Sequence, residues 1–162
     1  MSENAQPPVD AVDPLAGAPL AGRLRRLVAV LVDGLIALIA AIPILMYFDV
    51  WNTALAGQEP GLLVYIALFV WGLVAFVLIN YSLLDKRGQT VGKYLLGVAI
   101  VGLNGERKSA EHLLLRRYIP VSVATQLPVI GGLLATIDAL FIFGKSRRCV
   151  HDRIAGTQVV RV

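Results

Sequence analysis

Five charged residues in this sequence have types and positions that suit an ionic or proton-binding site within a membrane protein: Arg26, Asp33, Arg116, Arg117 and Asp138. Asp33 is the only charge in the apolar stretch 27–48, where an ionised carboxylate facing lipid alone would be costly. We therefore expect it to face a partner or water. Such a carboxylate can bind and release a proton or small cation, and it can equally form a structural ion pair that locks helix packing. Both alternatives stay open.

The other candidates fall in the second half of the chain. Asp138 lies about 9 Å from the end of its apolar run at helical rise, a depth similar to that of Asp33. The two acids, with arginines nearby, are consistent with a small polar cavity opening to the cytoplasm, and equally with a neutralised network. Arg116 and Arg117 can each reach phospholipid headgroups or pair with Asp33. Of the two, we expect Arg117 to point inward.

Two apolar stretches predict the elements that carry these charges. The stretch 27–48 is about 22 residues long, enough to cross ~30 Å of lipid as a helix. The stretch 62–84 is uncharged and of similar length, and its Asn80 is expected to bond to a neighbouring helix. Together they predict a transmembrane hairpin within a polytopic, all-α membrane protein.

The distribution of basic residues indicates orientation. All Lys and Arg fall within 23–26, 86–117 and 145–161, flanking the apolar segments, so the net charge of +4 indicates contact with the lipid surface and not with nucleic acid. With 57% hydrophobic residues and a mean hydropathy of +0.71, residues 21–162 are expected to form one membrane domain. Both termini are predicted to be cytoplasmic, and residues 1–20 to be a disordered tail without a signal peptide.

Residues 85–109 are expected to form a polar cytoplasmic segment. In it, 92–96 is read as an interfacial turn with Lys93 reaching up to the headgroups. A small cytoplasmic β-hairpin is predicted from 98–101, a turn at Asn104-Gly105, and 106–109. The C-terminal strand 157–162 has the composition to add to it, because two strands alone are marginal in water.

The apolar segment within 110–144 allows two arrangements. Pro128 and Gly131-Gly132 interrupt it, which favours a broken pair of helices at about 110–127 and 133–144, with both outer ends cytoplasmic. One long kinked span is the alternative, and it would place the basic C-terminal residues outside. Ser109 is the expected N-cap of the first helix.

Other motifs favour structural roles. Gly88-Gln-Thr-Val-Gly-Lys93-Tyr94 departs from a phosphate-binding loop in spacing and in lacking Ser or Thr after the lysine. Cys149, His151 and Asp152 show no recognisable catalytic arrangement, and Asp152 is expected to cap a short helix. A metal site built on His112 and His151 would need a third ligand. We expect no enzyme activity, no cofactor and no metal.

Three blocks of the sequence resemble the RDD family of small bacterial membrane proteins over about residues 20–162. They are Ala21-Gly-Arg-Leu-Arg-Arg-Leu-Val-Ala29 running into Val32-Asp33-Gly34; Gly88-Gln-Thr-Val-Gly-Lys93 with Leu96-Gly97, followed by Asn104-Gly105 and Arg116; and Val150-His-Asp-Arg-Ile-Ala-Gly-Thr157. The resemblance assigns the family's arginine to Arg26 and its first aspartate to Asp33. It assigns the second aspartate to Asp152, with Asp138 as the alternative.

The resemblance implies an integral protein of the bacterial inner membrane, with a role in cation/proton exchange or solute transport for some relatives. We expect a small transport module that uses intramembrane Asp and Arg groups, in the lipid bilayer and as a homo-oligomer or with a membrane-protein partner. The alternative is a non-catalytic structural or assembly subunit of a membrane complex.

Overall fold

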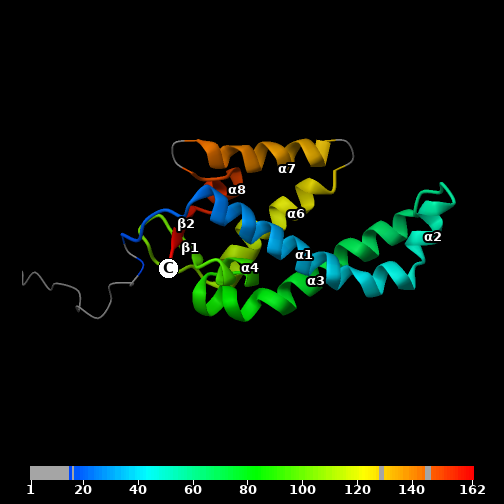
Figure 1. Ribbon diagram of the computed structural model, residues 1–162, viewed down its shortest axis with the longest axis horizontal. Helices are drawn as coiled ribbons and strands as arrows, with labels where there is room; N and C mark the ends of the chain where they lie inside the picture. The colour runs from blue at the N-terminus through cyan, green and yellow to red at the C-terminus, as the bar shows by residue number, and fades with distance from the viewer. Residues whose placement is uncertain (1–14, 16, 128–129, 145–146) are drawn as a thin grey trace, which may run out of the picture.

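The computed structural model describes residues 15, 17–127, 130–144 and 147–162. Two long helices, α1 (Arg23–Tyr47) and α3 (Leu62–Arg87), run side by side along the molecule and are joined at one end by the short helix α2 (Val50–Leu55) (Figure 1). Both are long and apolar enough to cross a membrane. α1 covers the predicted span 27–48 except for its last residue, the C-cap Phe48, and α3 contains the predicted span 62–84.

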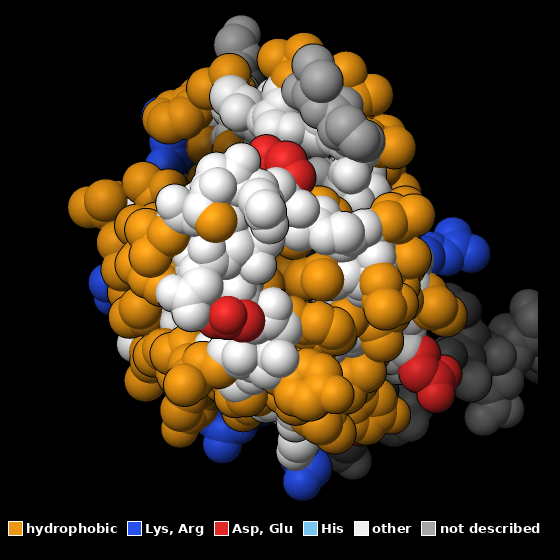
Figure 2. Space-filling view, turned by 90° about the vertical axis from the view of Figure 1, so that its right-hand side faces the viewer, with side chains coloured by type: hydrophobic (Ala, Val, Ile, Leu, Met, Phe, Trp, Pro, Cys, Tyr) orange, Lys and Arg blue, Asp and Glu red, His pale blue; other side chains and the backbone are white. Residues whose placement is uncertain are grey.

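The side chains of these two helices mostly face outward. Of the most apolar stretch of each helix, only 6% of α1 and none of α3 is buried, the opposite of a core helix in a water-soluble domain. The indole N–H of Trp71 on α3 donates to the carbonyl oxygen of Ala40 on α1 at 2.8 Å. Viewed from the α2 end, hydrophobic side chains cover most of the surface and Lys and Arg appear only at its edge (Figure 2).

The chain leaves α3 through a tight turn into α4 (Val91–Leu95) and then β1 (Val98–Gly102). Gly88 caps α3 in the left-handed region at φ 63°, and Thr90 caps α4 by accepting from the backbone N–H of Lys93. α4 packs against α1, and the Lys93 side chain is buried. The expectation that Lys93 reaches the headgroups is therefore wrong.

The sheet differs from the predicted hairpin. A turn does form after β1, where the N–H of Gly102 donates to Glu106 O, but 106–109 forms no strand. The partner of β1 is β2 (Thr157–Arg161), antiparallel, with Ala99 opposite Val160. All five β1 residues are buried, so β1 needs an apolar partner, which the charged run Glu106-Arg107-Lys108 cannot supply and β2 can.

The start of the domain lies along the other edge of β2. Leu20 forms a β-bridge with Val160, and the N–H of Ala21 donates to Val159 O at 2.9 Å. Most of the predicted tail, residues 1–14 and 16, lies outside the described residues. The end of that tail, at Leu20, is thus held by the C-terminal strand.

The segment 110–144 is a broken pair of helices. α5 (Ala110–Leu113), the π-helical turn η2 (Leu114–Tyr118) and α6 (Ile119–Thr125) form one continuous helical stretch, capped by the Ser109 side chain as predicted. A second stretch, α7 (Ile130–Leu140) and the 3-10 turn η3 (Phe141–Phe143), packs back against α6, and α8 (Val150–Ile154) leads into β2.

The sheet decides between the two arrangements considered for this segment. β1 precedes 110–144 and β2 follows it, and the two strands are hydrogen-bonded. Both ends of the segment therefore meet at the same end of the molecule, as the broken pair predicts and one long kinked helix does not. The buried core lies at this same end, where Ala29, Leu84, Leu113 and the sheet meet.

Candidate functional site

The most deeply buried charge of the described chain is Asp152, whose side chain has no exposed surface. It sits in the first turn of α8, where Oδ2 accepts the backbone N–H of Cys149 at 3.1 Å, as expected of a capping residue. Capping fixes the carboxylate in place but supplies no counter-charge. A buried carboxylate also needs positively charged neighbours, because burial removes the solvation that water would give it.

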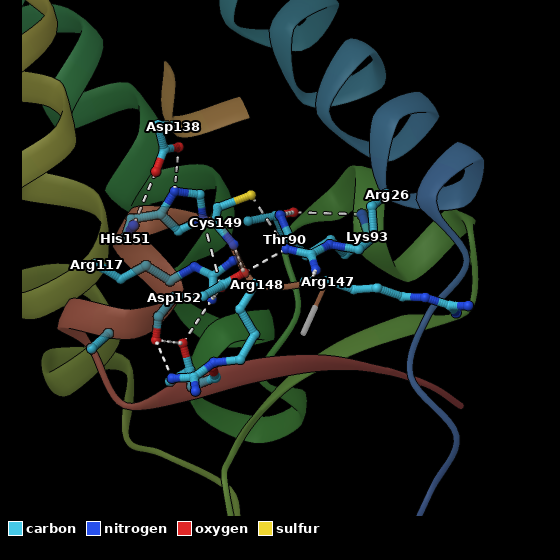
Figure 3. Close-up of polar contacts among 12 residues, drawn as sticks. Arg26, Thr90, Lys93, Arg117, Asp138, Arg147, Arg148, Cys149, His151 and Asp152 are labelled. Atoms are coloured by element: carbon cyan, nitrogen blue, oxygen red, sulfur yellow. Dashed lines mark hydrogen bonds and ion pairs between the residues drawn. The ribbon is translucent and has the colours of Figure 1, made fainter. Parts of the chain in front are cut away.

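Two arginines from distant parts of the chain supply that charge (Figure 3). Arg26, in the first turn of α1, places Nη2 2.5 Å from Asp152 Oδ2. Arg117, on η2, bonds through Nη1 to Asp152 Oδ1 and donates to Thr157 Oγ1 at 2.9 Å. We call Arg26, Asp152 and Arg117 the arginine–aspartate centre. It joins α1, η2 and α8.

Two adjacent arginines lie on the π-helical turn, and only one of them is buried. A π-turn inserts one residue into the helix and re-aims the side chains on it. Arg117 is 3% exposed, whereas Arg116 faces the surface. The prediction that Arg117 points inward is confirmed, but its partner is Asp152 and not Asp33.

The charges at the centre hold Asp152 ionised. Burial acts to raise the pKa of Asp152, but the positive charges of Arg117, His151 and Arg26 outweigh burial and lower the pKa below its usual value. Arg26 also donates through Nη1 to the backbone oxygen of Arg147, so its second terminal nitrogen has an acceptor. The centre thus carries one anion between two arginines, with little water access, and suits a structural lock.

Asp33 belongs to a separate site, formed by α1 and α4. Its Oδ1 accepts the backbone N–H of Gly92 at 2.7 Å, and its Oδ2 accepts the Thr90 hydroxyl at 2.5 Å. Lys93 Nζ lies 3.7 Å from Oδ2. We call these residues the α4 clasp of Asp33. The basic partner of Asp33 is therefore Lys93, and not Arg116 or Arg117.

The α4 clasp leaves Asp33 partly accessible. Its side chain is 19% exposed and lines a cavity of about 40 Å³ between α1 and α3, together with Asn80 and otherwise mostly apolar residues. Asn80 bonds across to α4, where its Oδ1 accepts the Val91 N–H at 2.9 Å, which confirms its predicted interhelical bond. A space of this size holds one or two water molecules or an ion of similar size.

Asp138 pairs with a histidine, and this pair lies at a different pocket. Asp138 Oδ2 is 2.6 Å from His151 Nδ1, and Asp138 Oδ1 accepts the His151 backbone N–H at 2.9 Å. Both line a pocket between α6, α7 and α8 that does not include Asp33. Among the residues that the structure describes, Asp33 and Asp138 therefore line separate spaces and do not share the small polar cavity that was one of the two alternatives.

His151 links Asp138 to the arginine–aspartate centre. Its Nε2 lies 3.6 Å from Asp152 Oδ1, and Cys149 Sγ lies 3.6 Å from Arg26 Nη2. Burial, followed by the charge of Asp152, raises the pKa of the Cys149 thiol to about 11. His112, the other candidate metal ligand, instead bonds to the backbone oxygen of Ala155.

Sequence reasoning missed four contributors: Thr90, Gly92, Lys93 and His151. The sequence signal for Thr90, Gly92 and Lys93 was the Gly88–Lys93 block, because a glycine such as Gly92 lets the backbone pack closely against another helix. A Cβ on Gly92 would lie 2.2 Å from Ala29 O, so only glycine lets α4 reach Asp33. No such spacing signal marks His151, because its partner Asp138 reaches it through tertiary folding.

Residues 20–156 match the sequence model of the RDD family. The chain belongs to the RDD family. Searches of curated proteins and of solved structures gave no match. In this RDD-family membrane protein, the residues that carried the resemblance, Arg26, Asp33 and Asp152, occupy two separate ionic sites that share the sheet end of the molecule.

Proposed function

We propose that this RDD-family protein is a small cation/proton exchange or solute transport module, in which Asp33 is the exchangeable group. The observation that carries the proposal is the α4 clasp: an accessible carboxylate with a lysine at 3.7 Å, at the base of a cavity between two helices that can span a membrane. A cation or a proton arriving at Asp33 competes with Lys93 for the same oxygen.

The contrast with Asp152 supports this assignment of roles. Each Asp152 oxygen meets an arginine and the side chain is fully buried, so exchange there would leave two buried cations unpaired. Asp33 pairs with one lysine, which lies farther from the carboxylate than the arginines lie from Asp152. Two neutral hydrogen-bond donors, the Thr90 hydroxyl and the Gly92 N–H, still bind the Asp33 carboxylate when the lysine moves away. Asp33 is therefore the carboxylate with the lower cost of exchange.

One copy of the chain encloses too little space for a pathway. The cavity at Asp33 holds about 40 Å³, and the remaining faces of α1 and α3 are exposed and apolar. We infer that transport takes place in a homo-oligomer or beside another membrane protein, because a second copy or a partner would cover these apolar faces and enclose more space.

A flux assay in proteoliposomes tests the proposal. Purified protein is reconstituted and proton movement is followed after pulses of Na⁺, K⁺ or Li⁺. We expect flux from the wild type, none from Asp33→Asn, and wild-type flux from Glu59→Gln, which removes an exposed carboxylate away from the cavity. Asp33→Asn with Lys93→Gln removes both charges together, so loss of flux in this folded double variant cannot be attributed to an unpaired lysine.

The second candidate function is a structural subunit of a membrane complex. Its favouring observation is the arginine–aspartate centre, in which two arginines pair with one buried carboxylate and join three segments. On this account the wild type shows no flux with any of the three cations, and Asp33→Asn lowers the unfolding temperature in detergent. Those two results together would replace the transport proposal.

We further propose a bacterial inner-membrane location with both termini in the cytoplasm. The basic residues flanking the apolar helices favour that side, and pairing of β2 with both β1 and Leu20 keeps the two ends of the domain together. A cysteine added after Val162, in a Cys149→Ser background, should react with an impermeant reagent only in inside-out vesicles. Labelling in right-side-out cells would contradict this topology.

A further inference from the structure

We propose that Asp138, Cys149 and His151 form a binding site for a divalent metal ion of the zinc class. One ligand atom from each of the three residues lies within 4.8 Å of the other two. Asp138 comes from α7, Cys149 from the residue before α8, and His151 from α8 itself. The site is independent of Asp33 and of the proposed transport function.

The donor set selects the metal. Carboxylate, thiolate and imidazole together suit Zn²⁺ or its spectroscopic substitute Co²⁺, whereas Mg²⁺ and Ca²⁺ prefer oxygen alone. Ligand atoms around a tetrahedral zinc, with bonds of about 2.0–2.3 Å, lie roughly 3.3–3.8 Å from one another. Movements of about 1 Å in side chains would therefore bring the three atoms to bonding positions.

The surroundings supply the outer contacts that metal-binding histidines usually have. The two ring nitrogens of His151 face different carboxylates, Nδ1 toward Asp138 and Nε2 toward Asp152 at 3.6 Å. A histidine that binds metal through one nitrogen commonly directs the other to a carboxylate, which fixes the ring. Asp152 is itself held by Arg26 and Arg117, so this second contact is rigid (Figure 3).

Charge balance is favourable as well. Binding replaces the thiol proton of Cys149, which leaves to water, and a bound divalent cation is neutralised by one thiolate and the Asp138 carboxylate. Arg26 Nη2 lies 3.6 Å from Cys149 Sγ, so the positive charge of the guanidinium stabilises the thiolate form of Cys149. The resulting site is neutral beside the arginine–aspartate centre.

The pocket gives the ion a route and an open position. Asp138 and His151 line a space of about 190 Å³ between α6, α7 and α8, whose other walls are mostly apolar. Three protein ligands leave a fourth position, which water can occupy from that side. A bound ion would also tie α7 to α8, which otherwise meet at the His151–Asp138 hydrogen bonds and few other contacts.

The test uses the full chain, purified in detergent with a tag that contains no histidine and stripped with a chelator. Zn²⁺ and Co²⁺ are then titrated in. We expect one equivalent to bind, the Co²⁺ complex to show a thiolate-to-metal charge-transfer band, and Zn²⁺ to raise the unfolding temperature. Cys149→Ser should lose the band, and Asp138→Asn and His151→Asn should each weaken binding at least about 10-fold.

His112→Asn is the matched control, because His112 is the other histidine of the chain and bonds outside the cluster. Its metal binding should equal that of the wild type. Absence of the charge-transfer band in wild-type protein would overturn the proposal without reference to any variant. Equal binding by wild type and His151→Asn would overturn it too, since the metal would then sit elsewhere.

Discussion

At the scale of single residues, the chain separates two carboxylates by how completely each is neutralised. Asp152 is fully buried between Arg26 and Arg117, whereas Asp33 keeps 19% of its side chain exposed beside Lys93. Burial of an ion costs several kcal/mol, which close pairing and hydrogen bonds must offset. Asp152 therefore depends on both arginines, and each arginine depends on Asp152.

Replacing Arg117 tests this dependence. Arg117→Met leaves Asp152 with one arginine in a buried setting and should lower the free energy of unfolding by about 3–5 kcal/mol. Arg116→Met is the neighbouring control, because Arg116 is exposed, and should change it by less than about 0.5 kcal/mol. Both are measured by thermal unfolding in the same detergent. Equal effects for the two would contradict the burial of Arg117.

At the scale of elements, hydrophobic composition predicted the features that depend on long apolar segments, namely the two long helices and the broken helical pair. The spans 27–48 and 62–84 match α1, to within one residue at its end, and α3, and the break in 110–144 falls between α6 and α7. The hairpin failed because Asn104-Gly105 signals only a local turn. The choice of β2 as partner depended on burial of both faces of β1, which only the assembled fold reveals.

The sequence predicted which charged residues belong to the candidate site, but it did not predict which of them pair with one another. Arg26 and Arg117 were named from their types and positions and Asp152 from the family resemblance, but the π-helical turn that carries Arg117 has no sequence signature. Lys93 was assigned to the lipid surface because snorkelling is the usual behaviour of a lysine near a membrane. Its actual direction follows from the contact between Gly92 and α1.

Gly92 is where that element-level contact can be broken. Gly92→Ala would place a Cβ 2.2 Å from Ala29 O and 2.9 Å from the Asp33 carboxylate, so α4 must move off α1. We expect a marked fall in unfolding temperature, and loss of flux if Asp33 transports. Gly34→Ala is the control, since its Cβ would meet nothing within 4 Å, and it should leave stability unchanged or slightly higher. Similar behaviour of the two variants would rule out the close approach.

At the scale of the whole molecule, the charge sites gather at one end and the apolar helices extend from it (Figure 1). The start of α1 is held there three times: Leu20 and Ala21 bond to β2, Arg26 binds Asp152, and Asp33 binds α4. The first helix and the C-terminal segment are thus one structural unit. Arg26, Asp33 and Asp152, the residues that the resemblance assigns to the family, all contribute contacts between these distant segments.

A double-mutant cycle between α1 and α8 tests that union most directly. The unfolding free energies of wild type, Arg26→Met, Asp152→Asn and the double variant give the coupling between the two side chains. The structure predicts a coupling of about 1–3 kcal/mol for this pair, and less than about 0.5 kcal/mol for the matched cycle of Arg26→Met with Asp33→Asn. A coupling near zero for Arg26 and Asp152, or a larger one for Arg26 and Asp33, would contradict it.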